Sequence, residues 1–83
     1  MKIKLKTGGL LGEYLPPGST ANRGELEVKE GATPADVMQQ LGMPIDRPYL
    51  TGVNGELITK DRRGSFVLID EDELSLMPPL KGG

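Results

Sequence analysis

Residues 25–42, ELEVKEGATPADVMQQLG, contain a strand pattern followed by the clearest helix pattern in the chain. Threonine caps a helix start through its hydroxyl, proline fits the first helical turn, an early carboxylate faces the positive end of the helix dipole, and glycine accepts a left-handed C-terminal cap. These four types occur here in that order, as Thr33, Pro34, Asp36 and Gly42. We therefore expect a short helix over about 34–41, which needs a sheet beneath its apolar stripe to be stable.

Alternating apolar and charged residues predict two half-buried strands before this helix. Residues 2–7, KIKLKT, place Ile3 and Leu5 on one face and the lysines on the other, and residues 25–29, ELEVK, repeat the pattern. The lysines of one strand and the glutamates of the other favour antiparallel pairing. Residues 8–24 between them are rich in glycine and proline, so we expect a short helical turn and then a mobile loop.

The sequence after the helix predicts further strands. Residues 50–58 contain another strand pattern, which is interrupted by Asn54-Gly55, a dipeptide that favours a type I′ turn. A polar loop over 59–65, a short buried segment over 67–69, an acidic turn over 70–73 and a last strand over 74–77 follow. The expected core consists of Ile3, Leu5, Leu26, Val28, Val37, Leu41, Leu68, Leu74 and Leu76.

This order of elements predicts an α+β fold of the β-grasp type, with one main helix packed across a mixed sheet of four to five strands. The 83 residues are enough for a single domain, 1–83. The resemblance to the β-grasp arrangement implies that the first and last strands are parallel neighbours.

The composition argues against several classes of function. The chain has no His, Cys or Trp and a net charge of −2, so the commonest general base, thiol nucleophile and zinc ligands are missing. The charge balance does not favour nucleic acid, and no run of apolar residues is long enough for a membrane span. We expect a cytoplasmic, monomeric carrier or binding protein that is not an enzyme and holds no metal or cofactor of its own.

The C-terminal residues form a narrow tail that begins at two conformationally restricted prolines. Pro78-Pro79 prevent the last strand from continuing, and Leu80-Lys81-Gly82-Gly83 follow. Two residues without side chains can enter a narrow channel of another protein, where a Cβ would clash. We expect 80–83 to be flexible, with the Gly83 carboxylate as the chemically distinctive group.

Three segments resemble the MoaD/ThiS sulfur-carrier family of ubiquitin-like proteins. They are Val53-Asn54-Gly55, the acidic turn from Ile69 to Leu74, and the ending Leu76-Met77-Pro78-Pro79-Leu80-Lys81-Gly82-Gly83. Length and the proline pair are closer to MoaD, the small subunit of molybdopterin synthase, than to ThiS. The chain departs from the family where Glu71 stands in place of a common glycine.

The resemblance implies a chemistry centred on Gly83. An E1-like enzyme would use ATP and magnesium to adenylate the Gly83 carboxylate, and a persulfide sulfur donor protein would convert this glycyl-AMP into a thiocarboxylate, or 1-thioglycine. The sulfur would pass to an acceptor enzyme such as the large subunit of molybdopterin synthase. Molybdopterin is the first pathway that the resemblance suggests, and a thiamine-type pathway is the second. Gly82 would keep the approach to the reacting carboxylate narrow.

Partner binding is expected beside the tail. Met77 points away from the core if Leu76 points inward, and Leu57 follows the Asn54-Gly55 turn. With Pro78, Pro79, Leu80 and Lys81, these two residues form the expected partner-binding set. The basic residues Lys60, Arg62, Arg63 and Lys81 favour a solvated surface, and steering of the protein to acidic partners is the alternative interpretation.

Two other functions fit the same tail or fold. A ubiquitin-like modifier would use an activated Gly83 to form an isopeptide bond with a lysine. A non-covalent β-grasp interaction domain would need no free Gly-Gly end.

Overall fold

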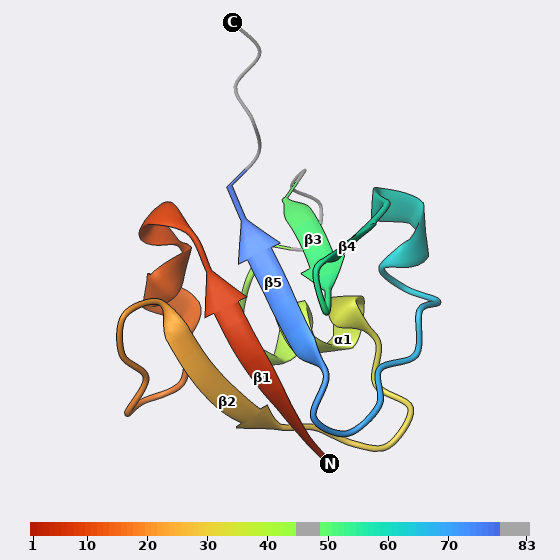
Figure 1. Ribbon diagram of the computed structural model, residues 1–83, viewed down its shortest axis with the longest axis horizontal. Coiled ribbons are helices and arrows are strands. Elements are labelled where there is room, and N and C mark those ends of the chain that lie inside the picture. The colour runs from red at the N-terminus through yellow and green to blue at the C-terminus, as the bar shows by residue number, and fades with distance from the viewer. Residues whose placement is uncertain (45–48, 79–83) are drawn as a thin grey trace, which may run out of the picture.

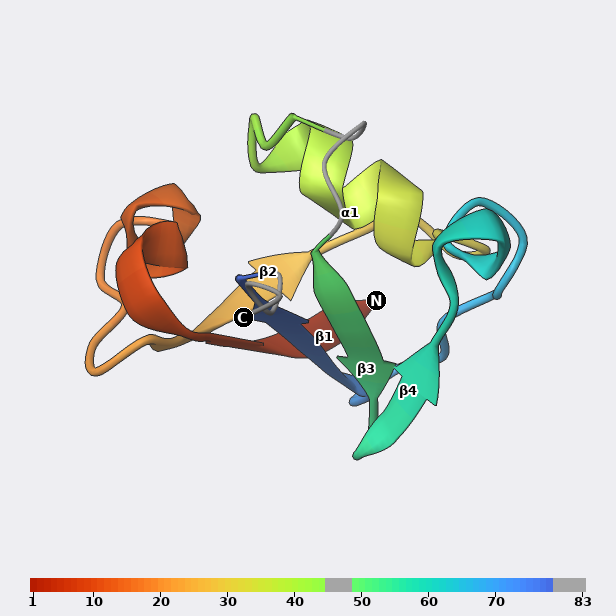
Figure 2. The ribbon, with the colours of Figure 1, turned by 90° about the horizontal axis from the view of Figure 1, so that it is seen from above.

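A computed structural model describes residues 1–44 and 49–78 as a five-stranded sheet covered on one face by a single α-helix (Figures 1 and 2). In chain order the elements are β1 (Lys2–Thr7), the 3₁₀ helix η1 (Gly9–Tyr14), β2 (Arg23–Glu27), α1 (Pro34–Gln40), β3 (Leu50–Val53), β4 (Glu56–Ile58), the 3₁₀ helix η2 (Lys60–Arg62) and β5 (Glu73–Met77). The sheet order is β2-β1-β5-β3-β4. This arrangement confirms the predicted α+β, β-grasp fold.

The first and last strands are parallel neighbours at the centre of the sheet, as expected. Leu5 pairs with Leu74 and Thr7 with Leu76, while the other three strand pairs are antiparallel. β5 therefore has a hydrogen-bonded neighbour on both sides, and Figure 1 shows it between β1 and β3.

The strand pair before the helix forms as the charge pattern predicts. β1 and β2 are antiparallel, with Lys4 opposite Glu25, and Lys2 Nζ lies 3.8 Å from Glu25 Oε1. β2 starts at Arg23, earlier than the expected range of 25–29, because the turn before it closes tightly through paired hydrogen bonds between Thr20 and Arg23.

The helix start contains a complete capping box. Thr33 Oγ1 accepts a hydrogen bond from Asp36 N (3.2 Å), and Asp36 Oδ2 accepts one from Thr33 N (3.0 Å). The helix ends at Gln40, one residue before the expected end, and Gly42 has the left-handed φ of +79° that its cap position requires.

The core lies between α1 and the sheet and agrees with most of the expected set. Leu26 and Leu41 are half-buried and pack against the core, whereas the other seven expected residues are buried. Six further residues complete it, namely Leu11, Ala32, Met38, Met43, Val53 and Ile58.

One sequence expectation between η2 and β5 is wrong. In 67–69 only Leu68 is buried, while Val67 is 58% and Ile69 66% exposed. Leu68 N donates to Ala32 O (2.8 Å), which leaves this extended segment with one side chain facing the core and its two neighbours facing out. The polar segment over 59–65 includes the short 3₁₀ helix η2, and its Arg63 side chain is buried.

In the described part of the chain, no helix has the length and apolar character needed to cross a membrane.

Candidate functional site

The candidate site is the C-terminal end of β5 with the sheet face opposite α1, which we call the outer face. Pro78 follows β5 and is exposed. The expected tail residues Pro79, Leu80, Lys81, Gly82 and Gly83 lie outside the described residues. The structure therefore describes the point at which the chain leaves the sheet.

Strand alternation brings Met77 and Leu57 to the outer face. Leu74 and Leu76 are fully buried against α1, so Ser75 and Met77 face the other way. Leu57 lies on the same face because it pairs with Gly52, which in turn pairs with Ser75.

Three side chains form what we call the outer apolar surface: Leu50, Leu57 and Met77. Leu50 pairs with Met77, and the small residues Gly52 and Ser75 lie beside that pair. Leu57 is 73% exposed, whereas Leu50 and Met77 are half-buried. Tyr49, Leu50 and Leu57 also line an open hollow of about 310 Å³ at the β4 edge.

The root of the tail lies against Gly8 and Gly9. Gly8 N donates to Leu76 O (3.1 Å), which extends the β1–β5 pairing to the end of β5. A Cβ built on Gly8 would lie 2.6 Å from Met77 Sδ, and one built on Gly9 would lie 3.1 Å from Pro78 Cγ. Sequence reasoning missed this contact because the two glycines carry no pattern that points to a residue 69 positions later.

The motifs that carry the family resemblance hold the start of β5 in place. Asn54 Nδ2 donates to Asp72 Oδ1 (2.8 Å), and Asn54 Oδ1 accepts from Glu73 N (2.9 Å). Asp72 Oδ2 also accepts from Ile69 N (2.9 Å). Both motifs therefore have a structural role, since they fix the β3–β4 turn against the strand that leads to the tail.

Of the expected steering residues, Lys60 and Arg62 are exposed and Lys81 lies outside the described residues. Arg63 is only 4% exposed, and its Nη1 donates to Met38 Sδ (3.9 Å). The expectation that Arg63 steers partners is therefore wrong, because its charge lies inside the protein.

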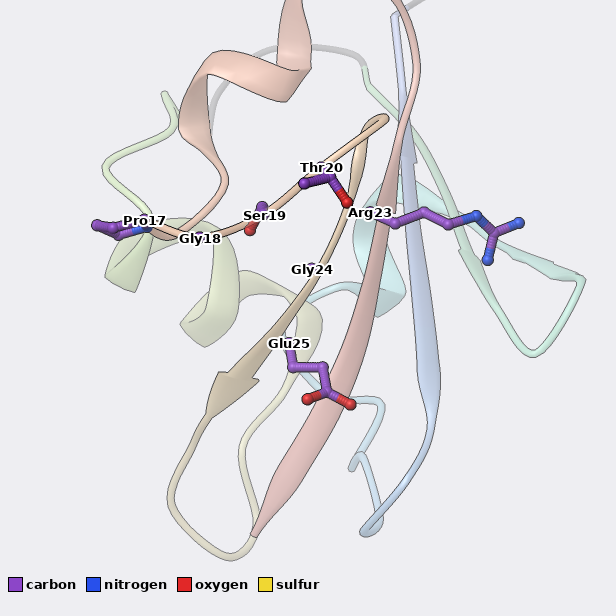
Figure 3. A pocket seen from close by; sticks show the side chains of 7 residues that line it. All are labelled: Pro17, Gly18, Ser19, Thr20, Arg23, Gly24 and Glu25. Carbon is purple, nitrogen blue, oxygen red and sulfur yellow. The ribbon is translucent and has the colours of Figure 1, made fainter.

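A second hollow, of about 300 Å³, lies over the β2 end of the sheet (Figure 3). Its charged side chains do not converge: Arg23 extends across β1, where its Nη1 is 3.8 Å from Glu73 Oε2, and Glu25 points away from it. Within residues 1–44 and 49–78, no three His, Cys, Asp or Glu side chains form a group that could hold a metal ion.

Comparison with known proteins gave one family match. A model of the ThiS family matches residues 18–83, which includes β5 and the Gly-Gly ending. A comparison with curated proteins found no match.

Solved structures with similar folds share about a fifth of their residues with this chain. Small archaeal modifier protein 1 of Haloferax volcanii is 20% identical, with 95% of this chain and 98% of that one covered and a TM-score of 0.70. The HVO 2177 protein of the same organism is 21% identical, with 100% and 87% covered and a TM-score of 0.78. A chain from the complex of subunits 1 and 2 of molybdopterin-converting factor from Helicobacter pylori is 19% identical, with 100% of both chains covered and a TM-score of 0.57. At these identities the likeness concerns the fold.

Proposed function

The chain belongs to the ThiS family, and from this premise we propose that it is a sulfur carrier whose working group is the Gly83 carboxylate. The observation that carries the proposal is the match over residues 18–83, which includes the whole path from β2 to the Gly-Gly ending. The geometry at the end of β5 supports it, because the chain leaves the middle of a rigid sheet at Met77-Pro78 beside an apolar outer surface.

The proposed chemistry begins with activation of a poor electrophile. A Gly83 carboxylate oxygen attacks the α-phosphorus of ATP on an E1-like enzyme, and pyrophosphate leaves. The terminal sulfur of a donor persulfide then attacks the glycyl carbonyl carbon and displaces AMP. A second thiolate attacks the donor sulfur of the resulting acyl disulfide, which releases the thiocarboxylate and leaves a disulfide on the donor.

In this scheme the chain positions the reacting group and partners supply the catalytic residues, ATP and magnesium. Gly82 and Gly83 would enter the partner's nucleotide site because they have no side chains, and Pro78 and Pro79 would set the tail's direction. We propose the cytoplasm as the location, and a molybdopterin precursor on a large-subunit enzyme as the first sulfur acceptor to test. The Helicobacter pylori structure is a complex of subunits 1 and 2 of a molybdopterin-converting factor.

The direct test is the intact mass of the protein after incubation with a candidate E1-like enzyme, ATP and a persulfide donor. We expect a mass increase equal to AMP less one water, and then a product in which one carboxylate oxygen of Gly83 is replaced by sulfur. Deleting Gly83, or adding one Ala after it, should abolish both, because either change moves the carboxylate by about 3.3–3.6 Å. Gly64→Ala, in an open surface position, serves as the matched control. Wild-type rates without Gly83 would reject the proposal.

The same experiment separates the carrier from a modifier. The modifier is the second candidate because the fold is similar to that of small archaeal modifier protein 1. A modifier would give products in which Gly83 is joined to a lysine of another protein, with loss of water, whereas a carrier would give the thiocarboxylate. A non-covalent interaction domain would bind its partner equally well with a blocked C-terminus.

Partner docking can be tested on the outer apolar surface. Leu57→Asp and Met77→Asp should each weaken binding to the activating enzyme, because each places a charge in an apolar contact. Val67→Asp is the matched control, since Val67 is an exposed apolar residue outside the sheet. Equal affinities for all three variants, measured by titration, would show that docking does not use this surface.

A further inference from the structure

The side chain of Met77 lies over the bare backbone of Gly8. The Met77 sulfur is 2.6 Å from the position that a Cβ on Gly8 would take, which is closer than real Cβ contacts. Thr7 faces the core and pairs with Leu76, so Gly8 and Met77 are outer-face neighbours at the ends of two parallel strands. Met77 is half-buried here, with its thioether directed toward the end of β1.

The same glycine lies against the first residue of the tail. A Cβ on Gly8 would be 3.3 Å from Pro78 Cδ, a distance at which one of the two atoms must move. Gly8 has φ −121° and ψ 156°, which any residue can adopt. Glycine is therefore favoured at position 8 because a side chain would not fit beside Met77 and Pro78. At position 9 it is also favoured by the backbone conformation, since φ is +56°.

We propose that Gly8 is a positioning residue for the tail. Its missing side chain forms a seat for Met77 and the Pro78 ring, and this seat determines how the outer apolar surface joins the tail root. The inference rests on the proposed carrier function. It adds a residue of the N-terminal strand region to a site otherwise made from the C-terminal half of the chain.

The seat predicts that Gly8→Ala changes function more than stability. The added methyl group meets the flexible end of Met77, which can rotate away at little cost, and Pro78 Cδ, which has to move by a few tenths of an ångström. Alanine at this backbone conformation also reduces the entropy of the unfolded chain. The contact with Met77 destabilises the folded state and the lower entropy of the unfolded chain stabilises it, and each effect changes the melting temperature by a few degrees at most. Because the two oppose each other, the melting temperature should stay within about 2 °C of wild type. Met77 would be displaced from the tail root.

A double-mutant cycle with Met77→Ala tests the coupling. With an activating enzyme that adenylates the wild-type chain, Gly8→Ala should lower kcat/KM about tenfold, because a small misplacement can be costly even at a distance from the reacting group. In the Met77→Ala background the same change should have a smaller effect on kcat/KM, because the Met77 side chain is already absent and only the contact with Pro78 remains. Gly64→Ala should match wild type. Equal effects of Gly8→Ala in both backgrounds would overturn the seat.

A measurement on the free protein keeps this inference separate from the carrier proposal. NMR of wild type with a labelled Met77 methyl group should show contacts between the Met77 side chain and the Gly8 α-protons, and the methyl resonance should shift in Gly8→Ala but not in Gly64→Ala. Absence of those contacts would overturn the seat whatever the enzyme assay gives. If they are present but no activating enzyme adenylates wild type, the carrier proposal fails and the seat stands as a structural feature.

Discussion

Thr51 carries a hydroxyl group into the apolar layer between the sheet and α1. It is 1% exposed and pairs with Leu76 and Ile58, both buried. In the described part of the chain, its Oγ1 is the one buried side-chain nitrogen or oxygen without a hydrogen-bond partner. A buried polar group that makes no hydrogen bond destabilises the folded state.

Thr51→Val should therefore raise the free energy of unfolding by about 1 kcal/mol, because it removes the desolvated hydroxyl and keeps the shape of the side chain. Thr7→Val is the matched control: Thr7 is also buried on an inner strand position, but its hydroxyl donates to Asn22 O (3.4 Å). Urea unfolding of both variants gives the comparison. A loss of stability in Thr51→Val would contradict the assignment of an unpaired hydroxyl.

Glu71 shows a second residue-scale effect, in backbone conformation. It stands where the family has a common glycine, and its φ is +71°. This left-handed conformation is unfavourable for a residue with a Cβ. The Lys4 Nζ–Glu71 Oε2 distance is 3.8 Å, but both side chains are more than half exposed, so the ion pair contributes little.

Glu71→Gly should stabilise the protein by roughly 0.5–1 kcal/mol, the relief of left-handed strain less the greater entropy of an unfolded glycine. Glu71→Ala removes the same ion pair but keeps the strain, so it should leave stability nearly unchanged. Thermal unfolding of the two variants separates the contributions. Equal stabilities of Glu71→Gly and Glu71→Ala would show that the left-handed conformation at position 71 does not destabilise the folded state.

At the scale of elements, α1 depends on its first turn. The helix has seven residues, too few to be stable alone, and its capping box satisfies two backbone N–H groups at the start. The pKa of Asp36 lies below its ordinary value of 3.8. The hydrogen bond that its carboxylate accepts from Thr33 N is the largest cause, the Thr33 side chain adds a smaller lowering, and burial opposes the shift.

The lowered pKa predicts a pH-dependent contribution to stability. A carboxyl group whose pKa is lower in the folded state stabilises fully above its unfolded pKa, and this stabilisation is lost as the pH falls through the folded pKa. Asp36→Asn should thus lower stability at pH 7 by roughly 0.5 kcal/mol, since it removes a charge at a helix N-terminus. The difference from wild type should shrink as the pH is lowered below about 4. A difference that stays constant from pH 7 to pH 2.5 would contradict this.

At the scale of the whole molecule, β5 connects the core to the tail. It lies between β1 and β3, its inner residues face α1, and its outer residues belong to the candidate site. The same five residues thus determine both how the fold holds together and where the tail leaves it.

Leu76→Ala should lower the free energy of unfolding by about 2–4 kcal/mol, because Leu76 is fully buried between β1, β3 and α1 and alanine would leave a cavity. Leu57→Ala is the same chemical change at a 73% exposed position and should stay within about 0.5 kcal/mol of wild type. Denaturant unfolding of the pair measures the contrast. Similar losses in both would show that the inner and outer faces of the sheet are misassigned.

The features that could be predicted from the amino-acid types are local. The Asn54-Gly55 turn has φ values of +52° and +86°, the capping box forms at Thr33 and Asp36, and β1 alternates as its side chains do. Each of these features depends on residues a few positions apart, whose preferences can be read from their types. The roles of Gly82 and Gly83 stay predictions, since they concern residues outside the described part.

Contacts between side chains that are far apart in the sequence depend on how the elements pack together. Leu68 is buried between exposed Val67 and Ile69 because its N–H is bound by Ala32 O, and Arg63 is buried because its chain passes the N-terminal end of α1, where its carbonyl accepts from Ala35 N. The Gly8–Met77 contact exists because the parallel pairing of β1 and β5 brings their ends together. No short-range preference encodes such contacts: they follow from how the strands pack, and a residue's type alone does not specify its distant neighbour.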